Sequence, residues 1–254
     1  MPFMAADRES STLYEAADGG ELPMLAFEPA EGTEPLAGIV LFHGGALREG
    51  SADGLAPHCR HLASRGIFAV SAGYRLLGQG AASIDDCVAD VRRAVEHFGR
   101  LAASRGLDAR RLASGGSSAG AHLALVAAMV APDEPGVAAV VALNPAGLDL
   151  LSFEPEVRRH LENEVGIAAG RIADYSLIEF VRPGNPPVLI HHGTEDQIAP
   201  IDQTRRFRDA MVRAGNECTL LEYEHAEHGF HYPGNSGHFD DVMDASARFL
   251  LDRE

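Results

Sequence analysis

Apolar runs that are long enough for buried strands alternate with helical stretches through most of this 254-residue chain. Strands with continuous apolar side chains are buried on both faces, as in parallel sheets that helices cover on each side. From Gly38 onward, strands and helices alternate five or six times. Such alternation is typical of a core built from one parallel sheet covered by helices. The apolar runs cover residues 37–42, 67–72, 137–143, 188–191 and 218–223.

This alternation predicts an α/β fold with a mostly parallel sheet of about eight strands and helices on both faces. Residues 11–16 and 22–28 flank Asp18-Gly19-Gly20, a hairpin-type turn, and add two strands. Residues 147–186 lack a strand pattern, so we expect one domain, 1–254, with this segment as a small lid. Predicted helices cover residues 52–65, 84–104, 119–130 (stopped by Pro132), 153–165, 174–181, 203–214 and 240–252.

The balance of charge limits the partners that the chain can bind. It carries 21 Lys and Arg against 37 Asp and Glu, a formal net charge of −16 at pH 7. This charge opposes binding to nucleic acid or an anionic membrane, so we expect a small-molecule partner, with a homodimer left open. The scattered Cys59, Cys87 and Cys218 form neither a disulfide framework nor a metal motif. These scattered cysteines favour a reducing compartment, and the polar residues 1–11 show no signal-peptide pattern. We therefore expect a cytoplasmic protein.

The strongest local pattern lies at residues 112–123, Leu-Ala-Ser-Gly-Gly-Ser-Ser-Ala-Gly-Ala-His-Leu. Gly116-Ser117-Ser118-Ala119-Gly120 matches G-x-S-x-G, a sharp strand-to-helix turn with a nucleophilic serine at its tip. Strand and helix approach so closely there that side chains at either glycine would collide. Ser118 is the candidate nucleophile, because the frame of its rival, Ser117, lacks the second glycine. A plain Gly/Ser-rich turn is the alternative, so the pattern needs support elsewhere.

A serine nucleophile needs backbone N–H groups that hold the negative charge of the oxyanion. His43-Gly44-Gly45 follows the first buried strand, and adjacent glycines leave the backbone open to a close substrate. We expect Gly44, Gly45 and Ala119 to donate to the oxyanion, and His43 to support the loop. The alternative is a turn that merely ends the strand.

The serine also needs a histidine base and a carboxylate that orients the histidine. Asp196 follows a buried strand and is preferred to Glu195, although it could instead cap the helix near Pro200. His228 is the preferred base, because it precedes Gly229 in the segment between the last strand and the last helix. The competing late histidines are His225, His231 and His238.

Together these motifs resemble the α/β hydrolases, in their hormone-sensitive-lipase-like and acetylesterase branches, over residues 37–250. The resemblance implies the α/β-hydrolase fold and a carboxylesterase with catalytic Ser118, Asp196 and His228, the oxyanion hole named above, and no cofactor or metal. The motifs that carry it are His43-Gly44-Gly45, Gly73-Tyr74-Arg75-Leu76, Gly116-Ser117-Ser118-Ala119-Gly120, Gly193-Thr194-Glu195-Asp196 and His228-Gly229-Phe230.

Two departures favour the compact acetylesterase or feruloyl-esterase-like members. The 42 residues before His43 have no helical cap pattern, and Ser117 stands where Asp is common. We therefore expect a serine carboxylesterase for short-chain acyl or small aryl esters. The alternatives are an arylformamidase-type amidase, whose elbow is similar to residues 118–123, a small serine peptidase and a non-catalytic receptor on this fold. A peptidase is disfavoured because the chain has no accessory domain that would select peptides. A receptor is disfavoured because it would not need Asp196 and His228, which are present.

Overall fold

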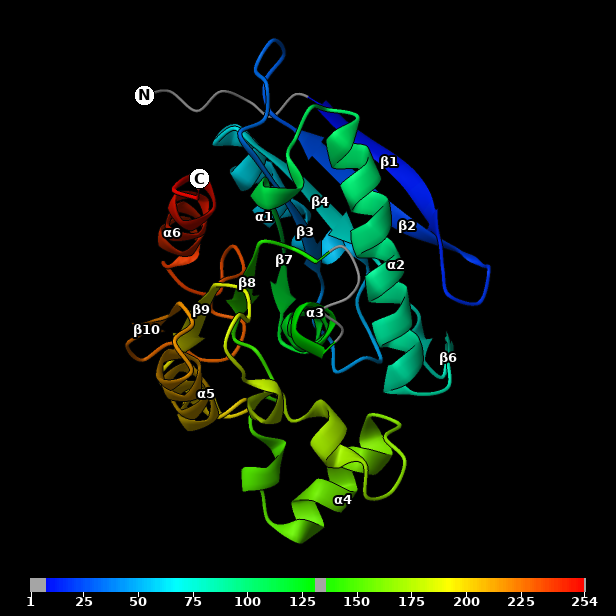
Figure 1. The fold of residues 1–254 in the computed structure, drawn as a ribbon, viewed down its shortest axis with the longest axis vertical. Helices are drawn as coiled ribbons and strands as arrows, with labels where there is room; N and C mark the ends of the chain where they lie inside the picture. The colour runs from blue at the N-terminus through cyan, green and yellow to red at the C-terminus, as the bar shows by residue number, and fades with distance from the viewer. Residues whose placement is uncertain (1–7, 131–135, 254) are drawn as a thin grey trace.

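The structure, a computed structural model, describes residues 8–130 and 136–253. Its centre is an eight-stranded sheet in the order β1-β2-β4-β3-β7-β8-β9-β10 (Figure 1). β1 and β2 pair antiparallel at one edge, and every pairing from β4 to β10 is parallel. This confirms the predicted mostly parallel α/β sheet. The strands are β1 (Arg8–Glu15), β2 (Glu21–Glu28), β3 (Ala37–Phe42), β4 (Ile67–Ala72), β7 (Leu112–Ser117), β8 (Ala139–Leu143), β9 (Val188–Gly193) and β10 (Cys218–Tyr223).

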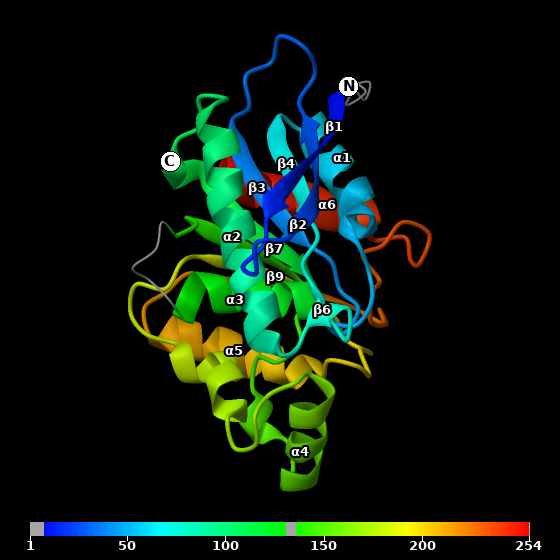
Figure 2. The same cartoon turned by 90° about the vertical axis from the view of Figure 1, so that its right-hand side faces the viewer.

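Helices cover both faces of the sheet (Figure 2). Alternate residues of β3 serve the two faces, as continuous apolar strands require. Ile39 and Leu41 pack in the cluster under α1 and α6, whereas Val40 and Phe42 pack in the cluster under α2 and α3. Within the described residues, no helix combines the length and apolar composition needed to cross a membrane. The α-helices around the sheet are α1 (Ala56–Ser64), α2 (Ile84–Ala103), α3 (Ala119–Val130), α5 (Ile201–Arg213) and α6 (Phe239–Leu251).

Several predicted elements differ in detail from those observed. The segment 52–65 divides into a 3₁₀ turn, η1 (Ala52–Leu55), and α1, which holds Pro57 in its first turn, where the missing N–H is tolerated. Residues 76–81 form a small second sheet of β5 (Leu76–Leu77) and β6 (Gly80–Ala81). Another 3₁₀ turn, η2 (Ala109–Arg111), precedes β7. The expected stop at Pro132 and most of the polar N-terminus lie outside the described residues.

Residues 147–186 lie between β8 and β9, and both views show them extending beyond one end of the sheet around α4 (Pro155–Glu164). The helix predicted at 174–181 is wrong, because Ser176 is extended there and its hydroxyl oxygen accepts the amide of Leu150 at 3.0 Å. The segment's 3₁₀ turns are η3 (Leu150–Ser152), η4 (Ile172–Tyr175) and η5 (Leu177–Phe180).

Buried histidines form hydrogen bonds inside this core. His191 on β9 lies 2.8 Å from the Tyr223 hydroxyl and 3.0 Å from that of Ser246. Burial lowers the pKa of His191 to about 3. His58 Nε2 lies 2.9 Å from His231 Nδ1, and burial lowers the pKa of His58 to about 4 and that of His231 well below its usual value. At neutral pH these imidazoles are therefore uncharged polar groups of the core.

β7 turns into α3 within one residue, and two glycines make that turn possible. A Cβ on Gly116 would lie 2.7 Å from the carbonyl carbon of Gly120. A Cβ on Gly120 would lie 2.1 Å from the carbonyl oxygen of Phe42, and one on Gly116 would lie 2.3 Å from the same atom. The expected collision of strand and helix is confirmed, and it includes the neighbouring strand β3.

Gly120→Ala should destabilise the fold, because the added methyl meets rigid backbone rather than a movable side chain. We expect a loss of about 2–3 kcal/mol in the free energy of unfolding, measured by urea denaturation. Gly99→Ala is the matched control: Gly99 is in α2 and a Cβ there meets nothing within 4 Å. It should stabilise the protein by about 0.5–1 kcal/mol. Equal effects of the two variants would contradict the close packing at the turn.

Candidate active site

The two adjacent serines of the elbow face different surroundings. Ser118 has φ 52, the strained conformation expected at the tip of such a turn, and its side chain lines a pocket. Its amide donates to the carbonyl oxygen of Leu143 at 2.9 Å, which anchors the turn to β8. Ser117 is buried on the other side, with its hydroxyl 3.0 Å from His231 Nε2. The rival serine is therefore turned into the core.

The structure brings together the three residues that the sequence singled out. Ser118 Oγ lies 3.0 Å from His228 Nε2, and His228 Nδ1 lies 2.7 Å from Asp196 Oδ2. His228 comes from the segment after β10, and Gly229 takes φ 77 directly behind it. Of the competing residues, His225 is exposed and pairs with Glu195 at 2.7 Å, away from Ser118.

Asp196 is a buried carboxylate with four hydrogen-bond partners. Oδ1 accepts the amides of Ile198 at 2.9 Å and Ala199 at 2.8 Å, and Oδ2 accepts from His192 Nε2 at 3.3 Å as well as from His228. Burial alone would raise the pKa of Asp196, but the hydrogen bonds from His192 and His228 hold it well below its usual range. The carboxylate is thus ionised, and it closes the turn before α5, whose N-cap is Pro200, instead of capping that helix.

Sequence reasoning missed three residues that hold this arrangement. His192 Nε2 lies 2.8 Å from the carbonyl oxygen of Ala199, and its Nδ1 lies 2.9 Å from the Thr204 hydroxyl. Asn144 directly follows β8 and has φ 37, and its Nδ2 lies 3.3 Å from His228 Nε2. An Asn-Pro pair directly after a buried strand was the available signal for Asn144, because Asn tolerates positive φ. Nothing local distinguished His192 or Thr204.

The loop after β3 is tight and well supported. His43 is buried, stacks on Tyr74 with ring centroids 4.4 Å apart, and lies with Nδ1 2.7 Å from the Gly44 carbonyl oxygen. The Gly45 carbonyl accepts the amides of Arg48 at 2.9 Å and Glu49 at 3.1 Å. Gly45 has φ 113, and a Cβ there would lie 2.2 Å from the carbonyl oxygen of Glu49. Only glycine fits this position, and His43 supports the loop in the expected way.

The same loop passes beside Ser118. A Cβ on Gly44 would lie 3.3 Å from Ser118 Cβ. Ala119 is the first residue of α3, so its N–H has no partner within the helix. Burial raises the pKa of Tyr232, and hydrogen bonds with Ser117 and the Gly44 backbone partly offset that rise.

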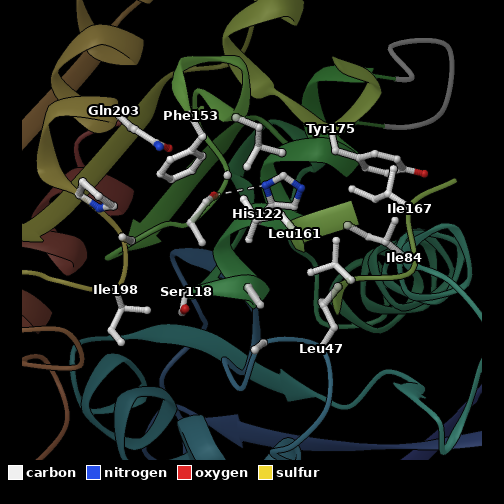
Figure 3. Close-up of a pocket in the computed structure, with 18 residues that line it drawn as sticks. Leu47, Ile84, Ser118, His122, Phe153, Leu161, Ile167, Tyr175, Ile198 and Gln203 are labelled. Carbon is white, nitrogen blue, oxygen red and sulfur yellow. Dashed lines mark hydrogen bonds between the residues drawn. The ribbon is translucent and has the colours of Figure 1, made fainter. Parts of the chain in front are cut away.

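An apolar pocket of about 220 Å³ opens beside Ser118 (Figure 3). Residues of the 147–186 segment form part of its wall, and a role of this segment as a lid stays a prediction. Ile198, a lining residue, is 73% exposed. The lining residues are Ala46, Leu47, Ile84, Ser118, Ala119, His122, Ala146, Gly147, Leu150, Phe153, Leu161, Val165, Ile167, Tyr175, Ile198, Ala199, Pro200 and Gln203.

Polar atoms in this pocket are few. The hydroxyl of Tyr175 donates to Asp85, and Gln203 Oε1 accepts the amide of Asp149 at 3.3 Å. In the part of the chain that the structure describes, His, Cys, Asp and Glu side chains form no group of three that could hold a metal ion. The pocket is thus suited to an apolar group placed next to a polar reaction centre.

Comparison with family models identifies this arrangement. The model of the BD-FAE family matches residues 25–211, which is most of the chain. The chain belongs to the BD-FAE family. BD-FAE proteins are hormone-sensitive-lipase-like α/β hydrolases, so the expected family and the α/β-hydrolase fold are both confirmed.

Solved esterases and curated hydrolases are similar to this BD-FAE chain. An esterase from Thermogutta terrifontis, Est2 with propionate bound, matches with a TM-score of 0.84 and 30% identity, over 97% of this chain and 95% of that one. A probable carboxylic ester hydrolase of Mycobacterium tuberculosis, LipM, is 28% identical over 81% of this chain and 51% of its own length. An ethyl acetate hydrolase of Pseudomonas putida is 36% identical over 44% of this chain and 35% of its own. The chain spans about half the length of these curated relatives, or less.

Asp196→Asn should remove a stabilising charge. We expect the free energy of unfolding at neutral pH to fall by about 1.5–3 kcal/mol, as for a hydrogen bond to a charged group. Because the folded-state pKa is held below the ordinary value of 3.8, the wild type keeps this stabilisation above that value and loses it as the pH falls further. Urea denaturation should therefore show a wild-type advantage that shrinks below about pH 4.

Glu195→Gln is the control for this prediction, because Glu195 and its partner His225 are exposed. This variant should change the stability by less than about 0.5 kcal/mol at neutral pH. A wild-type advantage over Asp196→Asn that persists unchanged in acid would contradict an ionised Asp196.

Proposed function

We propose that this protein is a serine carboxylesterase that hydrolyses short-chain acyl or small aryl esters. The observation that carries the proposal is the chain of contacts from Ser118 Oγ to His228 Nε2, at 3.0 Å, and from His228 Nδ1 to Asp196 Oδ2, at 2.7 Å. A nucleophile, a base and an orienting carboxylate in this geometry are what acyl transfer requires. The hydrolase family and the similarity to solved esterases support the same reaction.

The reaction proceeds in two halves through an acyl-enzyme. His228 Nε2 takes the proton of Ser118 as Oγ attacks the ester carbonyl carbon, and Asp196 stabilises the resulting imidazolium. The tetrahedral intermediate collapses, the carbon–oxygen bond to the alcohol breaks, and His228 gives its proton to the departing alkoxide. Water, deprotonated by His228, then attacks the acyl carbon to form a second tetrahedral intermediate. Its collapse breaks the bond between the acyl carbon and Ser118 Oγ, His228 returns the proton to Oγ, and the acid leaves.

The negative charge of each tetrahedral intermediate is held by backbone amides. We assign this role to Gly44, Gly45 and Ala119, and each donor is worth about 2.7–4 kcal/mol of transition-state stabilisation. The rigid loop and the start of α3 hold these amides ready before the substrate binds.

The pocket beside Ser118 is assigned to the acyl group. Its volume of about 220 Å³ and its apolar lining suit a short chain. Structures of Thermogutta terrifontis Est2 are described with propionate or butyrate bound, and others as phosphonylated by sarin or phosphorylated by paraoxon. Small acids and nucleophile-directed reagents in such a relative support both the acyl size and the chemistry proposed here.

Ser118→Ala should abolish hydrolysis of p-nitrophenyl acetate, with a fall in kcat of about 10⁴-fold or more. Labelling by a fluorophosphonate, followed by mass spectrometry, should modify the wild type at Ser118 and leave this variant unmodified. Ser117→Ala is the matched control, because Ser117 faces His231, and it should keep both labelling and turnover.

The alternatives give different outcomes in this assay. Faster turnover of N-formylkynurenine than of p-nitrophenyl acetate would favour the arylformamidase alternative. Labelling that depends on Ser117 would contradict the proposed nucleophile, and absence of labelling in the wild type would favour a receptor.

The size of the pocket predicts a preference for short acids. With p-nitrophenyl esters of increasing chain length, we expect kcat/KM for laurate to be lower than for acetate or butyrate by about tenfold or more, because the longer chain cannot be buried. Steady-state kinetics at substrate concentrations below micelle formation measures this. Comparable values for acetate and laurate would contradict the assignment of the acyl pocket.

A further inference from the structure

The entrance to the pocket beside Ser118 has an apolar rim. Three of the residues that line the pocket are exposed to solvent, and all three are apolar: Ala46, Ile198 and Pro200. They come from two loops, one after β3 and one between β9 and α5. Their side chains carry neither a hydrogen-bond donor nor an acceptor. A substrate that enters the pocket therefore passes an apolar surface, which we call the apolar rim.

Ile198 is the largest residue of the apolar rim, and it is 73% exposed. Among the described residues, the other large apolar residues that are exposed reach only 42–54%, and none of them lines this pocket. Single apolar residues are common on protein surfaces and carry no functional meaning by themselves. Ile198 differs from the others because it shares its pocket with the proposed nucleophile.

The backbone of Ile198 is held by the carboxylate that orients the proposed base. Asp196 Oδ1 accepts the amides of Ile198 at 2.9 Å and Ala199 at 2.8 Å, while Oδ2 lies 2.7 Å from His228 Nδ1. One carboxylate thus fixes both the imidazole and the backbone of the rim. The exposed side chain of Ile198 extends into solvent from this fixed point.

The pocket has a buried side and an open side. Ile84, Ile167 and Tyr175 are only 3–7% exposed, and in Figure 3 they lie together on the side away from Ser118 and Ile198. The buried side suits the acyl chain, because an apolar chain gains most where water is excluded. The two substituents of an ester carbonyl carbon point in different directions, so the alcohol part then points from Ser118 toward the open side.

The proposed base also lies where the alcohol can leave. In the proposed reaction His228 gives its proton to the departing alkoxide, and its side chain is 21% exposed. The oxygen of the departing alcohol is therefore close to solvent and next to the loop that carries Ile198. An apolar alcohol in this position would cover the exposed side chain.

We propose that Ile198, with the rest of the apolar rim, binds the alcohol part of the ester and selects apolar alcohols. This inference rests on the esterase function proposed above. Contact between two apolar surfaces removes both from water, whereas a polar alcohol finds no hydrogen-bonding side chain in the apolar rim. The preferred substrates are then short-chain acyl esters of alkyl or aryl alcohols rather than of polyols or sugars.

Three esters with the same acetyl group test this selection on the full chain: ethyl, butyl and 2-methoxyethyl acetate. The last two match in length, but an ether oxygen replaces one methylene group. For butyl over ethyl and for butyl over 2-methoxyethyl, the ratio of kcat/KM is divided by the ratio of the rates of hydroxide-catalysed hydrolysis. This correction removes differences in intrinsic reactivity. We expect both corrected ratios to be about three to ten in the wild type, because the added methylene groups are partly buried against Ile198.

Ile198→Ala removes most of the apolar surface and keeps the amide that binds Asp196, so it should lower both corrected ratios to about two or below. Ile198→Leu should keep them. Val212→Ala is the matched control, because Val212 is a 53% exposed residue of α5 outside the pocket, and it should leave both ratios as in the wild type. The ratio of kcat/KM for ethyl butyrate over ethyl acetate reports on the acyl group instead, and Ile198→Ala should not change it.

The outcomes separate the two proposals. A wild type that hydrolyses ethyl acetate but gives corrected ratios of about one overturns the role of Ile198 and leaves the esterase function intact. That role is equally overturned if Ile198→Ala keeps the wild-type ratios, or if it changes the acyl ratio and leaves the alcohol ratios unchanged. A wild type that hydrolyses no ester overturns both proposals.

Discussion

The contact of Gly120 with the backbone of β3 is the constraint on which the site depends. Without side chains at Gly116 and Gly120, α3 starts directly against the carbonyl oxygen of Phe42. β3 and β7 are neighbours in the sheet, with Phe42 paired to Gly116. The same close approach that exposes Ser118 therefore also brings the loop after Phe42 next to it. One packing requirement sets the positions of both the proposed nucleophile and the proposed oxyanion donors.

A second layer of hydrogen bonds lies behind this turn. Ser117 points away from Ser118 and meets His231, which in turn contacts His58 on α1. His231, three residues after His228, thus joins the segment that carries His228 to Ser117 on the buried side of the turn. On the other side, His192 holds the carboxylate that orients His228. Neutral imidazoles suit such positions, because each can donate on one nitrogen and accept on the other.

Much of the fold could be predicted from the local hydrophobic pattern. Much of the site could be predicted from the order of its motifs along the chain and their positions after strands. The continuous runs 37–42 and 67–72 coincide with β3 and β4 residue for residue, since strands buried on both faces leave a clear signal. The proximity of Ser118, Asp196 and His228 agrees with the expectation that functional side chains gather at the carboxyl ends of parallel strands. Their catalytic roles remain a prediction.

What the sequence did not reveal is tertiary in origin. Asn144 and His192 acquire their contacts only when β8 and β9 lie side by side; the Asn-Pro pair marks the turn at Asn144 but not its contact with His228, and no local pattern marks His192. The short 3₁₀ turns of the 147–186 segment could not be predicted from the sequence. They depend on contacts such as that between Ser176 and Leu150, and they leave no hydrophobic periodicity.

The buried histidines set a limit on the conditions that the fold tolerates. His58, His122 and His191 have folded-state pKa values of about 4 or lower, whereas an unfolded chain would protonate them near 6.5. As the pH falls below 6.5, these histidines bind protons in the unfolded chain but not in the folded core. The free energy of unfolding therefore decreases. Because these rings are buried and neutral, the fold is expected to be more stable near neutral pH than in acid.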